Sequence, residues 1–280
     1  MPKKYIEDDI NLSRLFLTAL PDFLSDVDVE GDFICNTNNL TSLKNAPYKL
    51  VSGKFDVSNN KLTSLKGAPR VVEGNFNCSN NKLTSLEGVS ESIGGYFYIN
   101  NNEVTSLEGI QSEIKGNFSC VDNRLTTLKG GPTIVNGNFV CNDNMINSLE
   151  GLPTSVRGFI SFGNNRLTSL KGAPEIANDF SCNGNQLTSL VGGPFKVKYD
   201  FNCSGNLLTN LVGSPVKVGG NFKCSNNILT SLEGCPKEVG GHFYYFHYDK
   251  KGKLNKKLNN FTEKEIRAVC DIRGNVIFKI

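Results

Sequence analysis

The sequence predicts a solenoid, in which the chain coils through successive similar turns around a parallel β-sheet. Three observations predict this fold. One pattern of about 21 residues recurs along most of the 280-residue chain. Each copy starts with apolar and polar residues in alternation, as in a short strand with one buried face. Each copy ends in a Gly- and Pro-rich stretch that is too short for a helix. Units of this length bury their apolar faces by stacking on their neighbours.

Two apolar columns define the strand. The first holds a large apolar residue every 21 positions, except for a first step of 22 and a step of 20 between Ile160 and Phe180. The second lies two residues later and is mostly Cys, so both columns point to one inner face of the sheet. The first column comprises Phe33, Phe55, Phe76, Phe97, Phe118, Phe139, Ile160, Phe180, Phe201, Phe222 and Phe243, and the second comprises Cys35, Val57, Cys78, Ile99, Cys120, Cys141, Phe162, Cys182, Cys203, Cys224 and Tyr245.

An Asn column lies five residues after each member of the first column. The amide side chain of Asn can donate to and accept from backbone groups that are exposed where a chain leaves a strand. We therefore expect a buried, structural Asn ladder rather than a catalytic or metal site. Its members are Asn38, Asn60, Asn81, Asn102, Asn123, Asn144, Asn165, Asn185, Asn206 and Asn227.

The rest of each unit returns the chain to the next strand. Two apolar residues three apart precede a Gly, usually then a Pro, and the unit closes on Val or Ile four residues before the next Phe. We expect turns, single 3₁₀ turns and extended chain on this convex side. A Gly two residues before most Phe residues, such as Gly74, indicates a tight corner. Asn178 and Tyr199 replace it beside the 20-residue unit, so we expect a local irregularity over residues 176–200.

The arrangement Phe-x-Cys-x-x-Asn-x-Leu resembles the leucine-rich repeat pattern Leu-x-Leu-x-x-Asn-x-Leu over residues 31–245. The resemblance implies an α/β-type leucine-rich repeat solenoid that is mostly β, with a parallel sheet on the strand face and an irregular convex side. The short unit, with Pro on the returning side, looks like repeats in bacterial effectors and most like phage-encoded leucine-rich repeat proteins. That likeness implies a bacteriophage protein with a host protein as its partner.

The repeats divide the chain into three parts. Residues 31–245 hold ten full repeats and a partial eleventh. Residues 1–30 are expected to form an N-terminal cap or degenerate repeat, in which Ile10 occupies the first apolar column. A short amphipathic helix over residues 9–19 is the alternative. A cap is needed at each end because an open end exposes apolar core and an unpaired strand.

Residues 246–280 are expected to form the C-terminal cap. Thr262 and Glu265 have the capping-box spacing, which predicts a helix over residues 262–271. Gly274 would end this helix, and Val276 to Ile280 would form a final strand. The small cap would therefore consist of one helix and one strand.

Composition excludes several function classes. The net charge of +3 provides no strong field toward nucleic acid or membrane. No apolar run has the length of a membrane span or of a signal peptide. Nine cysteines without paired spacing indicate a reducing, cytoplasmic environment, and we expect those of the second column to be buried free thiols. No Ser, His and acid set, phosphate loop or carboxylate pair stands out, so we expect no enzyme and no cofactor.

The outward residues of the strand face are the first candidates for function, because solenoids usually bind along this surface. Most of them are small Asn and Ser residues that could simply be solvated. Tyr96, Tyr98, Val121, Val140 and Phe159 are larger exceptions. Large side chains among small polar neighbours resemble interaction hot spots, and harmless exposure is the alternative.

A second candidate cluster lies at the C-terminal end of the repeats. It comprises Lys223, His242, Tyr244 and Phe246, followed by Tyr248. Packing under the C-terminal cap is the alternative interpretation. His242 and His247, near Cys235, do not have the paired spacing that zinc sites require, so we expect no metal.

The first functional hypothesis is a non-enzymatic, protein-binding scaffold that acts in the cytoplasm, in the host cytoplasm if it is phage-encoded. A bound or inhibited host bacterial protein, such as a defence component, would fit the resemblance. The alternatives are a structural component of a particle, assembled through an exposed terminal strand, and a nucleic-acid-binding protein that uses the lysines of residues 250–257. Nucleic acid is the less expected partner because positive and negative charges alternate along the turn edges.

Overall fold

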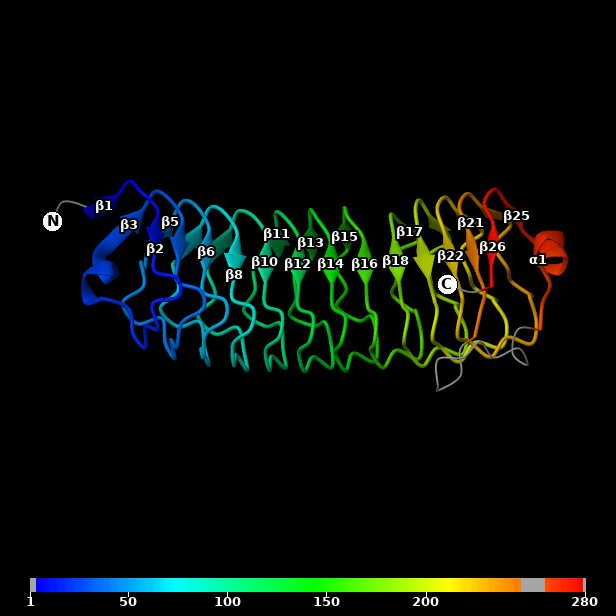
Figure 1. Cartoon of the computed structure of the whole chain (residues 1–280), viewed down its shortest axis with the longest axis horizontal. Helices are drawn as coiled ribbons and strands as arrows, with labels where there is room; N and C mark the ends of the chain where they lie inside the picture. Colours follow the sequence, from blue (N-terminus) through cyan, green and yellow to red (C-terminus); the bar gives the residue numbers. More distant parts are fainter. Residues whose placement is uncertain (1–3, 248–259, 279–280) are drawn as a thin grey trace. The chain divides into compact units, whose positions relative to one another are not determined.

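The computed structural model describes residues 4–247 and 260–278. The chain forms two compact units, one of residues 1–144 and 151–158, the other of residues 145–150 and 159–280. Both units consist of stacked turns of the repeat, and most turns contribute two very short parallel strands (Figure 1). We call the strands that start at the first apolar column the front strands, and those that precede them by a few residues the back strands.

Front strands pair in parallel within each unit. The Phe residues of the first column are direct partners, as in Phe55 with Phe76 and Phe201 with Phe222, so the repeat fixes the register. In the first unit these strands are β2 (Ile10–Asn11), β4 (Phe33–Ile34), β6 (Phe55–Asp56), β8 (Phe76–Asn77), β10 (Phe97–Tyr98), β12 (Phe118–Ser119) and β14 (Phe139–Val140). In the second unit they are β16 (Ile160–Ser161), β18 (Phe180–Ser181), β20 (Phe201–Asn202), β22 (Phe222–Lys223), β24 (Phe243–Tyr244) and β26 (Val276–Ile277).

Back strands replace much of the irregular convex side that the sequence predicted. They form where each unit closes on Val or Ile, and they pair in parallel because the same short segment recurs at the same height in each turn. In the first unit they are β1 (Lys4–Ile6), β3 (Val27–Val29), β5 (Leu50–Val51), β7 (Val71–Val72), β9 (Ser92–Ile93), β11 (Glu113–Ile114), β13 (Ile134–Val135) and β15 (Ser155–Val156). In the second unit they are β17 (Ile176–Ala177), β19 (Lys196–Val197), β21 (Lys217–Val218), β23 (Glu238–Val239) and β25 (Asp271–Ile272).

The repeated 3₁₀ turns that the sequence predicted on the convex side are not found in the described part of the chain. The 3₁₀ helix present there is η1 (Asp22–Asp26), which precedes β3 in the N-terminal region. The return path instead consists of turns, bends and the back strands.

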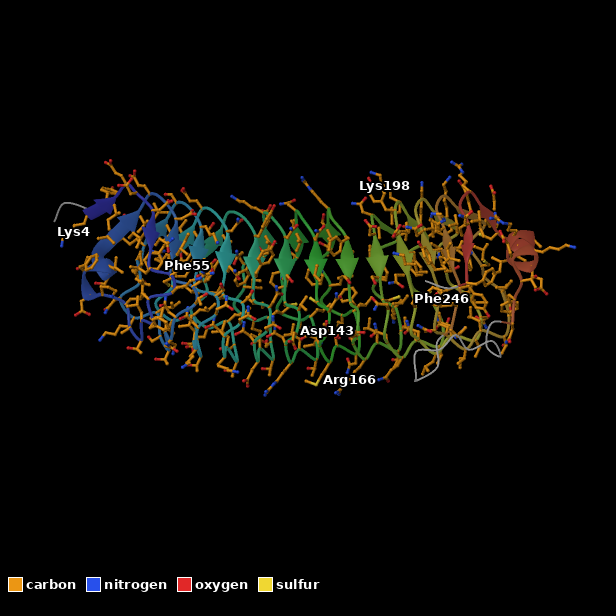
Figure 2. The ribbon with its side chains drawn as sticks, in the orientation of Figure 1. Lys4, Phe55, Asp143, Arg166, Lys198 and Phe246 are labelled. Atoms are coloured by element: carbon orange, nitrogen blue, oxygen red, sulfur yellow. The ribbon has the colours of Figure 1, made fainter. Side chains whose placement is uncertain are left out.

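The core lies between the front and back strands of each unit. The Phe side chains of the first column are almost completely buried, and the centres of successive Phe rings in this column lie 5.0 to 6.1 Å apart. Such separations allow stacked and edge-on contacts that add to the burial of apolar surface. Figure 2 shows Phe55 within the body of the first unit, whereas Arg166 and Lys198 extend from the edges of the second. All seven cysteines of the second column are buried free thiols, as predicted. Burial raises the pKa of Cys182 to about 12.

Two positions in each turn adopt positive φ. The first lies four residues after the first-column residue, as at Asn59 (φ 55°), and the second is the Gly after the two Leu residues, as at Gly67 (φ 92°). The left-handed conformation favours Asn and Gly, which explains both columns. Gly74, by contrast, has no positive φ, and an added Cβ would lie 2.5 Å from the carbonyl oxygen of Gly53. The Gly at this position in most turns is therefore needed for close approach between turns, at the corner that the sequence predicted.

The expected irregularity lies at the corner between β17 and β18. Two residues separate Ala177 from Phe180, whereas three separate Val197 from Phe201. Both strands still pair in register with the next turn, because the deletion is confined to the corner. The 20-residue unit therefore changes one corner and leaves the ladder intact.

The N-terminal turn is a degenerate repeat. Ile10 pairs with Phe33, and the predicted alternative of a helix over residues 9–19 is wrong, because this segment contains a strand and bends. The Leu residues of this turn are more exposed than those of later turns, and Leu15 is 54% exposed where later turns have the buried Asn.

The C-terminal helix forms where the capping box predicts it, although it is shorter. Helix α1 (Glu263–Val269) begins after Thr262, whose side chain accepts from the N–H of Glu265, and it ends at Cys270 rather than at Gly274. Gly274 instead lies between β25 and β26. Ile272 and Val276 pair with Val239 and Phe243, so the cap ends in one more turn of the solenoid. The predicted strand is Val276–Ile277, and residues 279–280 lie outside the described residues.

Candidate functional site

The Asn ladder lies inside the turns and is fully used by the backbone. Its ten side chains are 2 to 9% exposed. In a representative turn, the Asn123 amide donates to the carbonyl oxygens of Ile99 and Cys120 at 2.9 and 3.1 Å, and its Oδ1 accepts from Val104 N–H at 3.0 Å. Each ladder Asn thus joins its own turn to the one before it, and this column has no group left for a ligand.

A second set of Asp and Asn side chains lies on the outer surface of the front strands. We call the residue immediately before each first-column residue the outer column. Where this residue is Asp or Asn, its Oδ1 accepts a hydrogen bond from the outer-column N–H of the next turn. At 2.6 to 3.0 Å, with the acceptor named first and the donor N–H second, these bonds join Asp9 and Asp32, Asp32 and Lys54, Asn75 and Tyr96, Asn117 and Asn138, Asp179 and Asp200, Asp200 and Asn221, and Asn221 and His242. The polar outer surface, for which simple solvation was one interpretation of the sequence, is therefore partly structural.

Large side chains interrupt the outer column at Lys54, Tyr96 and Phe159. None of them can accept this hydrogen bond. Accordingly, the N–H groups of Asn75, Asn117 and Asp179 in the following turns have no acceptor among the described residues. A missing hydrogen bond of this kind forgoes roughly 0.5–1.5 kcal/mol of stability. Lys54 Nζ instead pairs with the Asp56 carboxylate at 2.7 Å, whereas Tyr96 and Phe159 remain 42% and 38% exposed.

Tyr96 and Tyr98 form a small aromatic surface on β10. Tyr96 is 42% exposed and Tyr98 is half-buried, and their rings lie 5.7 Å apart at 38°. The Tyr96 ring lies against Gly116 of the next turn, where an added Cβ would collide with it. Val121 and Val140, one and two turns further on, are also half-buried. The first unit therefore presents Tyr96, Tyr98, Val121 and Val140 as a partly exposed candidate surface.

Phe159 belongs to the second unit, where it borders a trough. It is 38% exposed, and it lies beside Asp179 because Ile160 and Phe180 are register partners. The trough has a volume of about 320 Å³ and a floor of small residues, including Ser161, Ser181 and Asn202. Asp200 and Lys223 border its other side.

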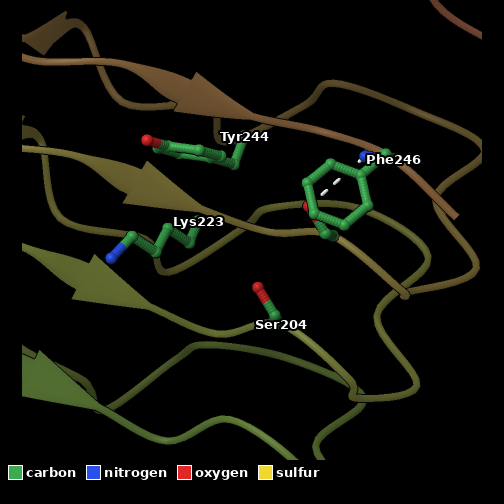
Figure 3. Close-up of a pocket in the computed structure, with 5 residues that line it drawn as sticks. Ser204, Lys223, Tyr244 and Phe246 are labelled. Atoms are coloured by element: carbon green, nitrogen blue, oxygen red, sulfur yellow. Dashed lines mark hydrogen bonds between the residues drawn. The ribbon is translucent and has the colours of Figure 1, made fainter. Parts of the chain in front are cut away.

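A neighbouring hollow lies at the C-terminal end of the same surface. Its volume is about 300 Å³, and it is lined by Ser204, Lys223, Ser225, Tyr244 and Phe246. Figure 3 shows Lys223 and Tyr244 extending to one side, with Phe246 on the other. The Phe246 N–H donates to the Ser225 hydroxyl at 3.3 Å, which fixes the chain at this point.

Lys223 lies between the trough and the hollow and is held in place by its contacts. Its Nζ is 3.0 Å from Asp200 Oδ2 and 5.7 Å from the centre of the Tyr244 ring. Partial burial alone would raise the pKa of Asp200. Hydrogen bonds from the Asn221 N–H and amide and from Lys223, with the charge of Lys223, outweigh burial and lower that pKa below its usual value. Asp200 is therefore ionised and paired.

The predicted C-terminal cluster is only partly available for binding. Lys223 and Tyr244 are half-exposed, but Phe246 is buried, at 7% exposure. His242 Nδ1 accepts from Asn275 N–H at 3.0 Å, so His242 takes over the capping role of the outer column. Packing therefore explains Phe246 and His242 better than the predicted outward binding role. Tyr248 and the lysines of residues 250–257 lie outside the described residues.

The sequence missed Asp179, Asp200, Ser204 and Ser225 as parts of the candidate site. The first two could have been found by reading the outer column as a column, since its members are Asp or Asn in most turns. Within residues 4–247 and 260–278, no group of three His, Cys, Asp or Glu side chains is arranged to hold a metal ion. No helix in that part of the chain has the length and apolar character for crossing a bilayer.

The fold and its surface define a leucine-rich repeat solenoid with candidate binding surfaces on the front strands. Two solved structures of leucine-rich proteins from Yersinia are similar to it. YopM, a leucine-rich effector protein from Yersinia pestis, has 18% identity and a TM-score of 0.48, with 95% of this chain and 88% of that chain covered. YopM from Yersinia enterocolitica has 18% identity and a TM-score of 0.42, with 86% of this chain and 65% of that chain covered. No family model and no curated protein matches the sequence.

Proposed function

We propose that this protein is a non-enzymatic scaffold that binds another protein through its front strands. One observation carries the proposal. At Tyr96 and Phe159 the chain replaces a capping Asp or Asn by an exposed aromatic residue, and the next turn loses a backbone hydrogen bond. Proteins commonly keep such locally unfavourable residues where function needs them.

The surroundings of these residues support a protein as the bound partner. Tyr, Phe and a positioned cation are typical of interaction hot spots. The front surface is shallow, with hollows of about 300 Å³ that suit single side chains rather than a whole enclosed small molecule. A broad surface with a few anchoring side chains is what repeat solenoids usually offer to a folded partner.

Affinity capture with matched variants tests the proposal. Tagged wild-type protein is expected to retain a stoichiometric protein from its native cells. Tyr96→Asn combined with Phe159→Asn should reduce capture at least about tenfold, as loss of two hot-spot residues would. The control is Tyr48→Asn, which removes a more exposed Tyr away from the front strands and should leave capture unchanged. Capture unaffected by the double substitution, or a wild-type protein that assembles only with itself, would refute the proposal.

We further propose, from the likeness of the repeat to phage-encoded leucine-rich repeat proteins, that the partner is a host bacterial protein such as a defence component. The protein would then act in the host cytoplasm. Expression in a bacterial host, with recovery of the same host protein by the wild type and not by the double variant, tests this finer claim. Recovery of only phage structural proteins would favour a role in particle assembly instead.

A further inference from the structure

The trough of the second unit combines an exposed aromatic ring with an unpaired carboxylate. Phe159 and Asp179 lie side by side on adjacent turns, and both border the same cavity of about 320 Å³. The lining of the cavity also contains the small polar residues Ser161, Ser181 and Asn202, and Phe159 is 38% exposed. The sequence did not predict that Phe159 and Asp179 border the same cavity, because they lie on different turns.

Asp179 and Asp200 occupy equivalent outer-column positions, yet their hydrogen bonding differs. Asp200 accepts from Asn221 and Lys223 through both carboxylate oxygens. Asp179 accepts a single bond, from the Asp200 N–H to its Oδ1 at 3.0 Å. No donor among the described residues reaches its Oδ2, and no cation there pairs with it. One carboxylate oxygen of the trough therefore remains available.

The charge of the trough favours a cation. Its lining contains two carboxylates, Asp179 and Asp200, and one ammonium group, Lys223, which leaves one negative charge. Lys223 already neutralises Asp200, so the excess charge resides at Asp179. An anionic group would be repelled there, and an apolar group would bury a carboxylate without a cation, which is unfavourable.

We propose that the trough binds an arginine side chain of the partner protein, with the guanidinium against the Phe159 ring and donating to Asp179 Oδ2. The inference rests on the proposed protein-binding function and specifies one contact of it. Arginine fits better than lysine because its planar guanidinium can lie on an aromatic face while it donates to a carboxylate in the same plane. The hydroxyls and amide of the trough floor, on Ser161, Ser181 and Asn202, offer further acceptors for its remaining N–H groups.

Short peptides serve as the probe, since the partner itself is unidentified. The capped tripeptides Gly-Arg-Gly, Gly-Lys-Gly and Gly-citrulline-Gly are titrated into the whole protein, and backbone amide chemical shifts are followed by NMR. Citrulline keeps the shape of arginine without its charge. We expect saturable shifts at Phe159, Asp179 and Ser181 with the arginine peptide, with a dissociation constant on the order of 1–10 mM for so small a contact. The lysine peptide should bind more weakly, and the citrulline peptide should give no saturable shift.

Asp179→Asn is the decisive variant. It keeps the oxygen that accepts from the Asp200 N–H, so the fold is retained, but it removes the charge. The arginine peptide should bind it at least about tenfold more weakly. Asp32→Asn is the matched control, because Asp32 is an outer-column acceptor outside the trough, and it should bind as the wild type does.

Two results would overturn the inference: no saturable shift around Phe159 up to about 50 mM arginine peptide, well above the expected constant, or equal binding by Asp179→Asn. Failure here is distinguishable from failure of the proposed function. If Phe159→Asn alone abolishes protein capture while the arginine peptide does not bind, the front strands bind a protein and the ligand of the trough is another group.

Discussion

Asparagine performs two different tasks in each turn, and its position decides which. On the inside, the ladder Asn donates to carbonyl oxygens of two turns and accepts from a backbone N–H. On the outside, an Asp or Asn of the outer column only accepts, from the N–H of the following turn. Both tasks satisfy backbone groups that the very short strands leave without partners.

Asn123→Ala should lower the free energy of unfolding by about 2–4 kcal/mol. The substitution leaves the Val104 N–H and two carbonyl oxygens buried without partners, and each such group is destabilising by roughly 1–3 kcal/mol before relaxation. Chemical denaturation measures the change. Thr126→Ala, at an exposed position in the same turn, is the control and should differ from wild type by less than about 0.5 kcal/mol. A loss this small for Asn123 would show that the ladder is dispensable.

Leu128→Ala should destabilise the first unit by about 2–5 kcal/mol, the usual range for a buried Leu that leaves a cavity. Leu128 is fully buried in a central turn, so neighbouring turns can collapse into the space only in part. Thermal or chemical unfolding gives the value. If the loss were below about 1 kcal/mol, the core would be far more adaptable than its close ring contacts indicate.

The structural role of the inner residues was predicted from the sequence, whereas that of the outer Asp and Asn residues was not. Phe, Cys and ladder Asn recur at fixed offsets because each turn places them against the same neighbours. The outer column recurs less strictly, since Asp, Asn and the His242 imidazole can all accept the same hydrogen bond. The outer column repeats a chemical role, hydrogen-bond acceptance, and not one residue type. The sequence therefore showed no regular column there, and the small outward polar residues were interpreted as solvated surface.

At the scale of the element, two-residue strands are stable only because they are stacked. An isolated pair of this length would not form, but each front strand here has a parallel neighbour in register. The front strands were predictable from their alternation of inner and outer residues. The back strands were not, because a single Val or Ile within a Gly- and Pro-rich segment shows no alternation.

The back strands of the first unit are interrupted between β9 and β11. The Pro position of most turns holds Ser90 and Gln111 in the two turns at this interruption. The Ser90 hydroxyl and both polar atoms of the Gln111 amide are buried without a partner in the described residues. Pro69 and Pro132 occupy the same position in the flanking turns and are buried.

Ser90→Pro and Gln111→Pro should therefore each raise stability, by about 1 kcal/mol. The substitution removes unpartnered polar atoms and restricts the unfolded chain, while the replaced backbone N–H has no acceptor among the described residues. An increase in melting temperature of a few degrees is expected. Thr133→Pro is the control and should be destabilising, because its N–H donates to Ser112 at 2.8 Å. A decrease for both Ser90→Pro and Gln111→Pro would show that the interruption is needed for folding.

The capping box sets the start of α1, so Thr262→Ala should make this helix fray. Thr262 accepts from Glu265 N–H at 3.3 Å, and the Glu265 carboxylate accepts from Thr262 N–H at 2.7 Å. Loss of such a cap is destabilising by about 1 kcal/mol. Hydrogen exchange should accelerate at the amides of residues 265–269, with little change in the repeats. Lys264→Ala, on the exposed side of the helix, should leave exchange unchanged.

At the scale of the whole molecule, repetition and function are separated. Columns that recur in nearly every turn build the solenoid and therefore say nothing about a partner. The residues that we propose for binding lie where a column is interrupted, at Tyr96 in the first unit and Phe159 in the second. Their size among small neighbours singled them out in the sequence, and the hydrogen bonds of the outer column add a second reason for the proposal.

The free energies of unfolding of Tyr96→Asn and Phe159→Asn test this separation most directly. Each Asn can restore the missing outer-column hydrogen bond, to Asn117 N–H or Asp179 N–H. Stability should accordingly stay within about 0.5 kcal/mol of the wild type or rise by up to about 1 kcal/mol, while capture of the partner protein is lost. If either substitution instead lowered stability by more than about 2 kcal/mol with capture retained, the aromatic residue would be part of the fold and not of a binding surface.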